Sequence, residues 1–259
     1  MEVNHGFFEY NSSKYSYDDV GSGQPVIFLC GWGSPCAAAD IFPLARQLGE
    51  GYRFIALDRP GYGDTDTAAK DDYLLVLAAF VEHLGLEDYI LVGHSLGTLY
   101  ALNYAKGRSG IRGVVLIDSF PVGGLLLKIN RSMGRMTASA RKKGVLEKMS
   151  DEKLLETAAS NYDMPDELRA LTLRRIRTNQ YNDRVLAEIE AFKDTPKTIY
   201  KGMETISAPV ICLCRKQTHK ANLKYAKYIP GCRVIRVENS SHYIHHDHPD
   251  ITSEVILEL

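Results

Sequence analysis

The clearest chemical signal in the sequence is the pentapeptide GHSLG at positions 93–97. It follows the apolar run Tyr89–Val92 and opens a helical pattern over Leu96–Lys106, so the sequence predicts a strand, a sharp turn and a helix. A serine on such a turn has a strained backbone that projects its hydroxyl clear of the sheet. The glycines avoid collisions with neighbouring backbone, and the helix N-terminus adds positive charge and free N–H groups. Ser95 is therefore the candidate nucleophile, and an ordinary helix N-cap is the alternative.

Two stretches of the chain show the alternation of strand and helix that would position such a serine. Short apolar strands are expected at Val26–Cys30, Arg53–Leu57, Tyr89–Val92, Gly113–Ile117, Val210–Cys214 and Arg233–Val237. Helices are expected at 36–49, 71–84, 96–106, 221–228 and 251–259. Aromatic residues at Phe7–Tyr10 and Lys14–Asp19 predict an N-terminal hairpin. Alternation of this kind produces a parallel sheet with helices on both faces.

The middle of the chain departs from this alternation. Residues 121–205 contain no convincing strand, four helical segments and a net charge of about +4. We therefore expect one α/β core formed by residues 1–120 and 206–259, with residues 121–205 inserted as a helical cap. The cap arginines are expected mostly on solvated helix faces, although one could reach inward to an acidic substrate group.

Ser95 in its strand–turn–helix setting resembles the nucleophile of the α/β-hydrolase superfamily, over roughly residues 7–118 and 205–259. The resemblance implies an α/β-hydrolase fold, with a mostly parallel central sheet, helices on both faces and an inserted helical cap. It also implies an oxyanion loop after the third strand, the serine after the fifth, an acid after the sixth or seventh, and a histidine after the eighth. Each of these positions can be compared with the sequence.

The segment LCGWG at 29–33 resembles the family's oxyanion loop. The resemblance assigns the backbone N–H groups of Trp32 and Leu96 to the oxyanion hole, where two fixed donors face the developing negative charge. Cys30 stands where the family usually has histidine, and we interpret it as a small buried hydrophobe. The indole of Trp32, the only tryptophan, either walls the substrate pocket or covers the loop.

The segment SSHYIHHDHP at 240–249 resembles the family's histidine loop and places His242 as the general base. Three further histidines follow in the same segment, namely His245, His246 and His248. Metal sites need converging acidic or thiolate ligands, and no such pattern accompanies them. We therefore expect these three at the surface or at a helix start, with no metal and no organic cofactor.

The acid is the point at which the chain departs from the commonest family pattern. No Asp or Glu occurs between Thr205 and Val237, and Gln217 and Thr218 fall near the usual position. Asp118 ends the strand Gly113–Ile117, at the carboxyl edge of the expected sheet. It is the candidate acid of the triad, which would hold the tautomer of His242. A structural role for Asp118, a Ser–His dyad and an impaired enzyme are the alternatives.

Composition restricts the partners and the cell compartment that we expect for this protein, but it does not indicate a reaction. The 259 residues carry a formal net charge of −1, with 45% hydrophobic and 24% charged residues, which is typical of a folded globular protein. Near-zero charge argues against nucleic acid or a membrane as the main partner. Five cysteines, no basic apolar leader and no apolar run near 18 residues favour the cytoplasm. We expect a monomer or a homodimer.

Together these observations predict a serine hydrolase that cleaves a small or medium acyl ester, with a small-molecule acyl compound as its substrate. Four residues are expected to line the pocket, namely Gly31, His94, Phe120 and Tyr243. A peptidase or amidase similar to proline iminopeptidases is one alternative, and it would need acidic cap residues to hold a substrate amine. A non-catalytic binding protein that retains the pocket is the other alternative.

Overall fold

The computed structural model describes residues 2–119, 124–160, 162–191 and 200–259. Among them an eight-stranded sheet has the order β1-β2-β4-β3-β5-β6-β7-β8. The strands are β1 (Val3–Tyr10), β2 (Ser13–Gly21), β3 (Gly23–Leu29), β4 (Gly51–Leu57), β5 (Tyr89–His94), β6 (Ile111–Ile117), β7 (Val210–Arg215) and β8 (Arg233–Val237). The mostly parallel α/β sheet that the sequence predicts is therefore confirmed.

The register of the parallel strands brings the candidate site residues to one edge. β1, β2 and β4 pair antiparallel, and every pairing from β4 to β8 is parallel. At the carboxyl end of the sheet, Leu29 of β3 pairs with Gly93 of β5, and Ile117 of β6 pairs with Leu213 of β7. The residues that follow these strand ends therefore emerge side by side, as ligand-binding edges of parallel sheets require.

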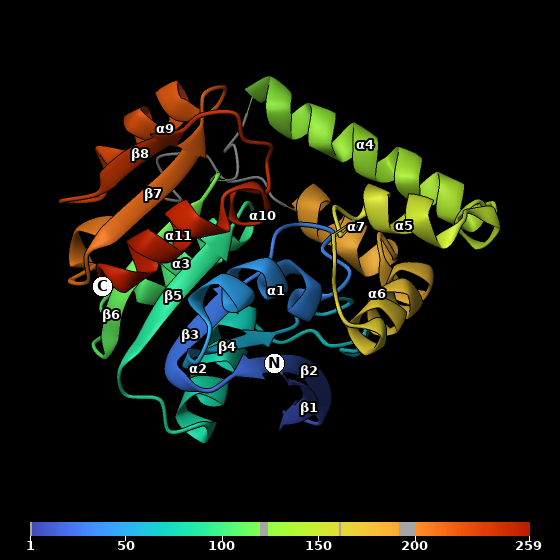
Figure 1. The fold of residues 1–259 in the computed structure, drawn as a ribbon, viewed down its shortest axis with the longest axis horizontal. Helices are drawn as coiled ribbons and strands as arrows, with labels where there is room; N and C mark the ends of the chain where they lie inside the picture. Colours follow the sequence, from blue (N-terminus) through green and yellow to red (C-terminus); the bar gives the residue numbers. More distant parts are fainter. Residues whose placement is uncertain (1, 120–123, 161, 192–199) are drawn as a thin grey trace.

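Helices cover both faces of the sheet (Figure 1). On one face lie α1 (Ala37–Leu48), the short α10 (Ile244–Asp247) and α11 (Pro249–Leu257). On the other face lie α2 (Tyr73–His83), α3 (Gly97–Ala105) and α9 (His219–Ala226). The sequence patterns anticipated each of these helices except α10, which is too short to show a periodicity.

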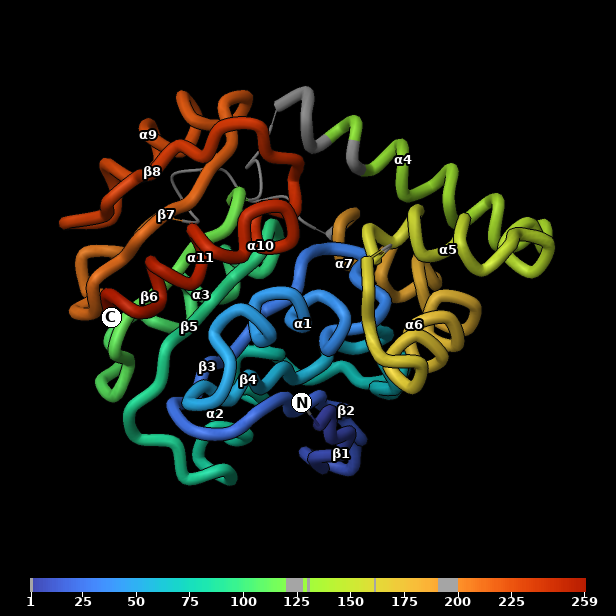
Figure 2. The backbone as a smooth tube through the Cα atoms, in the orientation of Figure 1, coloured from blue at the N-terminus to red at the C-terminus, as the bar shows by residue number. Residues whose placement is uncertain are grey.

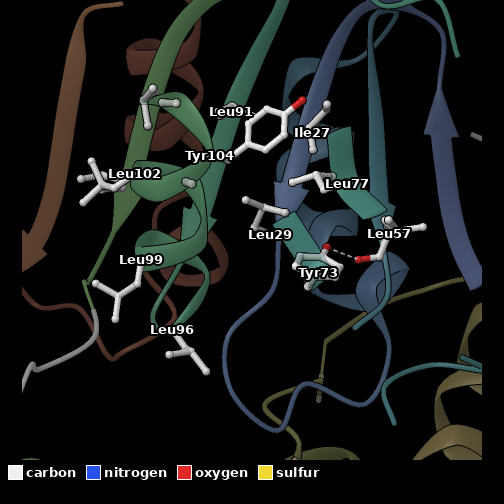
Figure 3. Packing of buried hydrophobic residues seen from close by; sticks show 14 of the residues in the cluster. Ile27, Leu29, Leu57, Tyr73, Leu77, Leu91, Leu96, Leu99, Leu102 and Tyr104 are labelled. Atoms are coloured by element: carbon white, nitrogen blue, oxygen red, sulfur yellow. Dashed lines mark hydrogen bonds between the residues drawn. The ribbon is translucent and has the colours of Figure 1, made fainter. Parts of the chain in front are cut away.

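The core divides into two layers because alternate side chains of each strand point to opposite faces. In β3, Ile27 and Leu29 pack against α2 and α3, whereas Val26 and Phe28 pack against α1 and α11. Figure 3 shows the first layer, in which Tyr73 is buried and its hydroxyl donates to the Leu57 carbonyl at 2.6 Å. Burial on both faces explains the continuous apolar runs that identified these strands.

Between β6 and β7 the chain forms a group of helices that lies to one side of the sheet (Figure 2). They are α4 (Gly124–Lys142), a 3₁₀ turn at Leu146–Lys148, α5 (Asp151–Thr157), α6 (Asp166–Asn179) and α7 (Asp183–Ala191). A further 3₁₀ turn, Met203–Thr205, precedes β7. No helix among the described residues combines the length and apolarity that a membrane crossing requires. We refer to α4–α7 as the cap helices.

Polar contacts attach the cap helices to the core. Arg175 of α6 is fully buried and pairs with Asp18 of β2 at 2.7 Å and with Asp64 at 3.0 Å. The side-chain amide of Asn182 donates to the Gly61 carbonyl at 2.8 Å. The loop after β4 therefore binds α6 through Asp64 and the residue before α7 through Gly61, and it anchors the cap helices to the core.

Candidate active site

Ser95 lies on a strained turn between β5 and α3. Its φ angle is +50°, a left-handed conformation that costs a non-glycine residue about 1–2 kcal/mol. The turn is held because the Ser95 N–H donates to the Ile117 carbonyl at 2.9 Å, and the Thr98 hydroxyl donates to the Ser95 carbonyl at 2.6 Å. This is the local geometry that the strand–turn–helix pattern predicted for the serine.

The two glycines around Ser95 are required by close backbone approach. A Cβ atom at Gly93 would lie 2.7 Å from the Gly97 carbonyl oxygen, which is closer than real Cβ contacts allow. A Cβ atom at Gly97 would collide with the Leu29 carbonyl at the end of β3. The turn therefore packs directly against the strand that leads into the segment 30–33.

The carboxylate of Asp118 lies at the end of β6 and meets His242, with 2.6 Å between Oδ2 and Nδ1. Arg215 Nε donates to the same carboxylate at 2.8 Å, and the Thr218 hydroxyl donates to it at 2.5 Å. Asp118 is 1% exposed, and its φ angle of +41° turns its side chain toward the loop after β8. Thr218 thus supports the acid from the position at which the family commonly has the acid itself.

The charge state of Asp118 follows from these contacts. Burial alone would raise the pKa of its carboxyl, but the hydrogen bonds from His242 and Thr218 and the charge of Arg215 lower it below the usual value. Asp118 is therefore a carboxylate at neutral pH. A carboxylate can only accept, so Nδ1 of His242 is the donor in this hydrogen bond.

His242 lies beside the serine turn. Nε2 of His94, the residue before Ser95, is 3.1 Å from the His242 carbonyl oxygen, and the two imidazole rings are 4.7 Å apart. Asp247 accepts from the Ser241 N–H at 2.6 Å, which fixes the loop that carries His242. The acid–histidine pair and the serine turn are thus joined at one sheet edge.

The segment 30–33 passes against the serine turn. A Cβ atom at Gly31 would lie 3.2 Å from Ser95 Cβ and 3.0 Å from His94 Nδ1, so only a glycine fits there without displacing its neighbours. No hydrogen bond between described residues uses the backbone N–H of Trp32 or of Leu96. Both residues lie near Ser95, Leu96 as the next residue in the chain and Trp32 through the neighbouring Gly31.

The sequence of the chain matches a known protein family over most of its length. A sequence profile described as "Alpha/beta hydrolase family" matches residues 26–255. The chain belongs to the alpha/beta hydrolase family. The family and the fold that the sequence motifs predicted are both confirmed.

The chain matches curated relatives over less than half of its length. It is 37% identical over 120 residues to a non-heme haloperoxidase of Rhodococcus erythropolis, covering 43% of this chain and 42% of that protein. It is 33% identical over 111 residues to AB hydrolase superfamily protein YisY of Bacillus subtilis, covering 36% of each. The chain thus spans about two fifths of the length of the curated relatives it matches.

Solved structures match almost the whole chain. A putative lipase from Acinetobacter baumannii has a TM-score of 0.76 at 20% identity, covering 99% of this chain and 90% of that one. The epoxide hydrolase CorEH has a TM-score of 0.75 at 18% identity, covering 99% of this chain and 98% of that one. At such identities the likeness shows the fold alone.

The four residues expected to line the pocket take different places in the structure. A Cβ atom at Gly31 would lie 3.2 Å from Ser95 Cβ, and Tyr243 adjoins His94 with 4.9 Å between ring centroids. His94 is 2% exposed, and burial lowers the pKa of its imidazole well below the usual value. His94 is therefore a buried, neutral side chain that contacts the loop carrying His242. Phe120 lies outside the described residues.

The three later histidines lie at helix starts, one of the two places that the sequence predicts for them. His245 and His246 begin α10 as expected, but His245 is fully buried, and burial lowers the pKa of its imidazole well below the usual value. The fold also brings the buried Asp40 of α1 to them, with candidate ligand atoms of the three within 4.8 Å of one another. Sequence spacing had no means of showing this partner, because it is about 200 residues away.

We assign no metal to the cluster of Asp40, His245 and His246. Both ring nitrogens of His246 already face backbone carbonyls, at 3.1 Å from the Ala159 oxygen and 3.0 Å from the Asp40 oxygen. A metal would have to displace at least one of these contacts. The Asp40 side chain lies 3.9 Å from Nε2 of His246, beyond hydrogen-bond distance.

Proposed function

We propose that this hydrolase cleaves a carboxylic ester of a small or medium acyl group through an acyl-serine intermediate. The observation that carries the proposal is the placement of Ser95, at φ +50°, on the sheet edge where Asp118 and His242 are paired at 2.6 Å. Serine on such a turn, backed by an oriented imidazole, is the arrangement of a nucleophile with its general base.

In the proposed reaction the Ser95 oxygen attacks the ester carbonyl, and its proton passes to Nε2 of His242. The N–H groups of Trp32 and Leu96 stabilise the negative charge that develops on the carbonyl oxygen. His242 then protonates the leaving alcohol, and the C–O bond of the ester breaks. Water attacks the acyl-serine, gives a proton to His242, and releases the carboxylic acid as Ser95 regains its proton.

Halide displacement is a poorer fit to the residue at the turn. Two further curated relatives are named haloalkane dehalogenase 2, from Mycobacterium bovis and Mycobacterium tuberculosis. A carboxylate that displaces a halide forms an ester, which water can cleave, whereas a serine would form an ether that water cannot cleave under the same conditions. Ser95 therefore favours acyl transfer over alkyl transfer.

A peptidase that binds a substrate amine is disfavoured by the charges of the cap helices. Among the described residues of α4–α7, Glu188 of α7 is the acid that is not exposed. Its carboxylate already accepts from Arg59 Nε at 2.7 Å, from Tyr100 at 2.8 Å and from the Tyr62 hydroxyl. No unpaired buried carboxylate among these residues is left for an ammonium group.

The substrate class can be tested with a series of p-nitrophenyl esters, from acetate to decanoate, beside aminoacyl p-nitroanilides. We expect turnover of the esters, highest for short or medium chains, and at least about 100-fold less turnover of the anilides. Ser95→Ala should abolish the ester turnover. Faster cleavage of the anilides would favour the peptidase alternative, and no cleavage by wild-type protein would favour the non-catalytic one.

A further inference from the structure

The backbone of the segment 30–33 is held by two side chains from the loop after β4. Arg59 donates from Nη1 to the Cys30 carbonyl at 2.9 Å and from Nη2 to the Gly31 carbonyl at 3.1 Å. The Gly33 N–H donates to the Tyr62 hydroxyl at 3.3 Å. These contacts lie on both sides of Trp32, so they fix the direction in which its N–H points.

Both of these side chains depend on one carboxylate of the cap helices. Glu188 Oε1 accepts from Arg59 Nε at 2.7 Å, and Oε2 accepts from the Tyr62 hydroxyl. Tyr100 of α3 adds a third donor at 2.8 Å. Arg59 is only 3% exposed, and a buried guanidinium needs a partner of opposite charge to hold one position.

The indole of Trp32 makes a second link to the same helix. Its Nε1–H donates to the Val185 carbonyl of α7 at 2.8 Å, about one turn before Glu188. Its ring packs edge-on against Tyr181 at 5.1 Å, and it occupies the space that a Cβ atom at Gly134 of α4 would need. The segment 30–33 is therefore joined to the cap helices through its backbone and through its single large side chain.

We propose that α7 sets the position of the oxyanion loop, and that Glu188 is a positioning residue acting through Arg59 and Tyr62. This inference rests on the proposed acyl-transfer function. Loss of the Glu188 charge leaves Arg59 buried without its partner, so both of its carbonyl contacts loosen. The Trp32 N–H then no longer points at the oxyanion, which forms only as the reaction proceeds. The change should therefore lower kcat while leaving KM nearly unchanged.

The test compares Glu188→Gln with Glu190→Gln. Glu190 is on the same helix but exposed, and it pairs with Arg135 on the surface at 2.6 Å. With p-nitrophenyl butyrate, Glu188→Gln should lower kcat by about 10- to 100-fold and leave KM within about twofold. It should also weaken binding of a trifluoromethyl ketone, which forms a tetrahedral adduct with the serine, by a similar factor. Glu190→Gln should match wild type in all three.

Trp32 gives a readout that does not depend on catalysis, because it is the only tryptophan. We expect Glu188→Gln to increase quenching of its fluorescence by acrylamide and to shift its emission, while Glu190→Gln changes neither. Absence of turnover by wild-type protein would reject the proposed function, yet the fluorescence comparison would still decide whether α7 holds the loop. Wild-type kcat and unchanged fluorescence in Glu188→Gln would overturn the inference.

A second variant covers failure of Glu188→Gln to fold, which circular dichroism would reveal. Tyr62→Phe keeps the ring but removes the hydroxyl that joins Gly33 to Glu188. It should lower kcat by about 3- to 30-fold with KM nearly unchanged, because the Arg59 contacts persist. A KM increase at constant kcat would contradict a positioning role and indicate direct substrate contact.

Discussion

Asp118 and His242 are separated by 124 positions in the chain, and 2.6 Å separates their Oδ2 and Nδ1 atoms. Asp118 comes from the end of β6, whereas the loop after β8 carries His242. The carboxylate is held further by Arg215 and Thr218, both from β7 and the loop that follows it. Asp118 thus follows the sixth strand, and its carboxylate is held by residues of the segment 205–237, which contains no Asp or Glu of its own.

Replacement of this acid should impair catalysis without unfolding the chain. Asp118→Asn retains the shape but presents an amide to His242, which favours the wrong tautomer, so kcat should fall by about 10⁴-fold. Steady-state ester hydrolysis measures the loss, and thermal unfolding checks the fold. Asp88→Asn, at an exposed ion pair with Arg112, is the matched control. Activity of Asp118→Asn near that of wild type would remove Asp118 from the mechanism.

The left-handed backbone conformation of Ser95 should lower the free energy of unfolding, because a non-glycine residue is strained there. Ser95→Gly and Ser95→Ala both remove the hydroxyl, but only glycine adopts a φ near +50° without strain. We expect the glycine variant to exceed the alanine variant in unfolding free energy by about 1 kcal/mol, or about 2–4 °C in Tm. Equal melting temperatures for the two inactive variants would show that the turn stores no strain.

The contact between Gly31 and Ser95 predicts a sensitive position in the oxyanion loop. Gly31→Ala places a methyl group 3.2 Å from Ser95 Cβ, so the loop must shift by a few tenths of an ångström. Misplacement of the Trp32 donor should lower kcat/KM by about 10- to 100-fold. Gly49 has a φ of +67°, so Gly49→Ala strains the backbone although the space around it is open, and this variant controls for a loss of stability at another position. Full activity in Gly31→Ala would place the oxyanion donors elsewhere.

The contacts of Asp64 with Arg174 and Arg175 of α6 should make the stability of the fold depend on pH. Burial alone would raise the pKa of Asp64, but hydrogen bonds and charge from Arg174 and Arg175 lower it to about 2. A carboxyl with a depressed pKa stabilises the fold above its unfolded pKa, near 3.9, and loses that contribution as the pH falls toward 2.

Asp64→Asn should therefore cost about 1–3 kcal/mol of unfolding free energy at pH 7. The difference from wild type should shrink between about pH 4 and pH 2. Urea unfolding at several pH values measures it, with the exposed Asp163→Asn as control. A difference that stays constant down to pH 2 would refute a role for the ionised carboxylate.

Local patterns were sufficient to predict the elements that carry the chemistry. Ser95 could be predicted because its turn demands two glycines between an apolar strand and a helix, and the strands because both of their faces are buried. The family resemblance added His242 and the candidate oxyanion donors. Asp118 was reached by elimination, since the segment 205–237 contains no acid.

What the sequence could not show are contacts between distant segments. Glu188 had no local signal, because its importance comes from Arg59, Tyr62 and Tyr100, three residues about 90 to 130 positions earlier in the chain. The same reason hid the meeting of Asp40 with His245. Burial of His245 was missed because a run of histidines resembles a surface segment, whereas here the helix α10 turns one of them into the core.

Labelling by a fluorophosphonate tests the central claim most directly. The reagent phosphonylates a serine only when its oxygen is activated, so it reports the nucleophile without requiring the natural substrate. Intact-mass measurement should show one adduct on the folded wild-type chain, peptide mapping should place it on Ser95, and Ser95→Ala should remain unlabelled. A folded wild-type chain that gains no adduct, or gains it at another residue, would contradict the account.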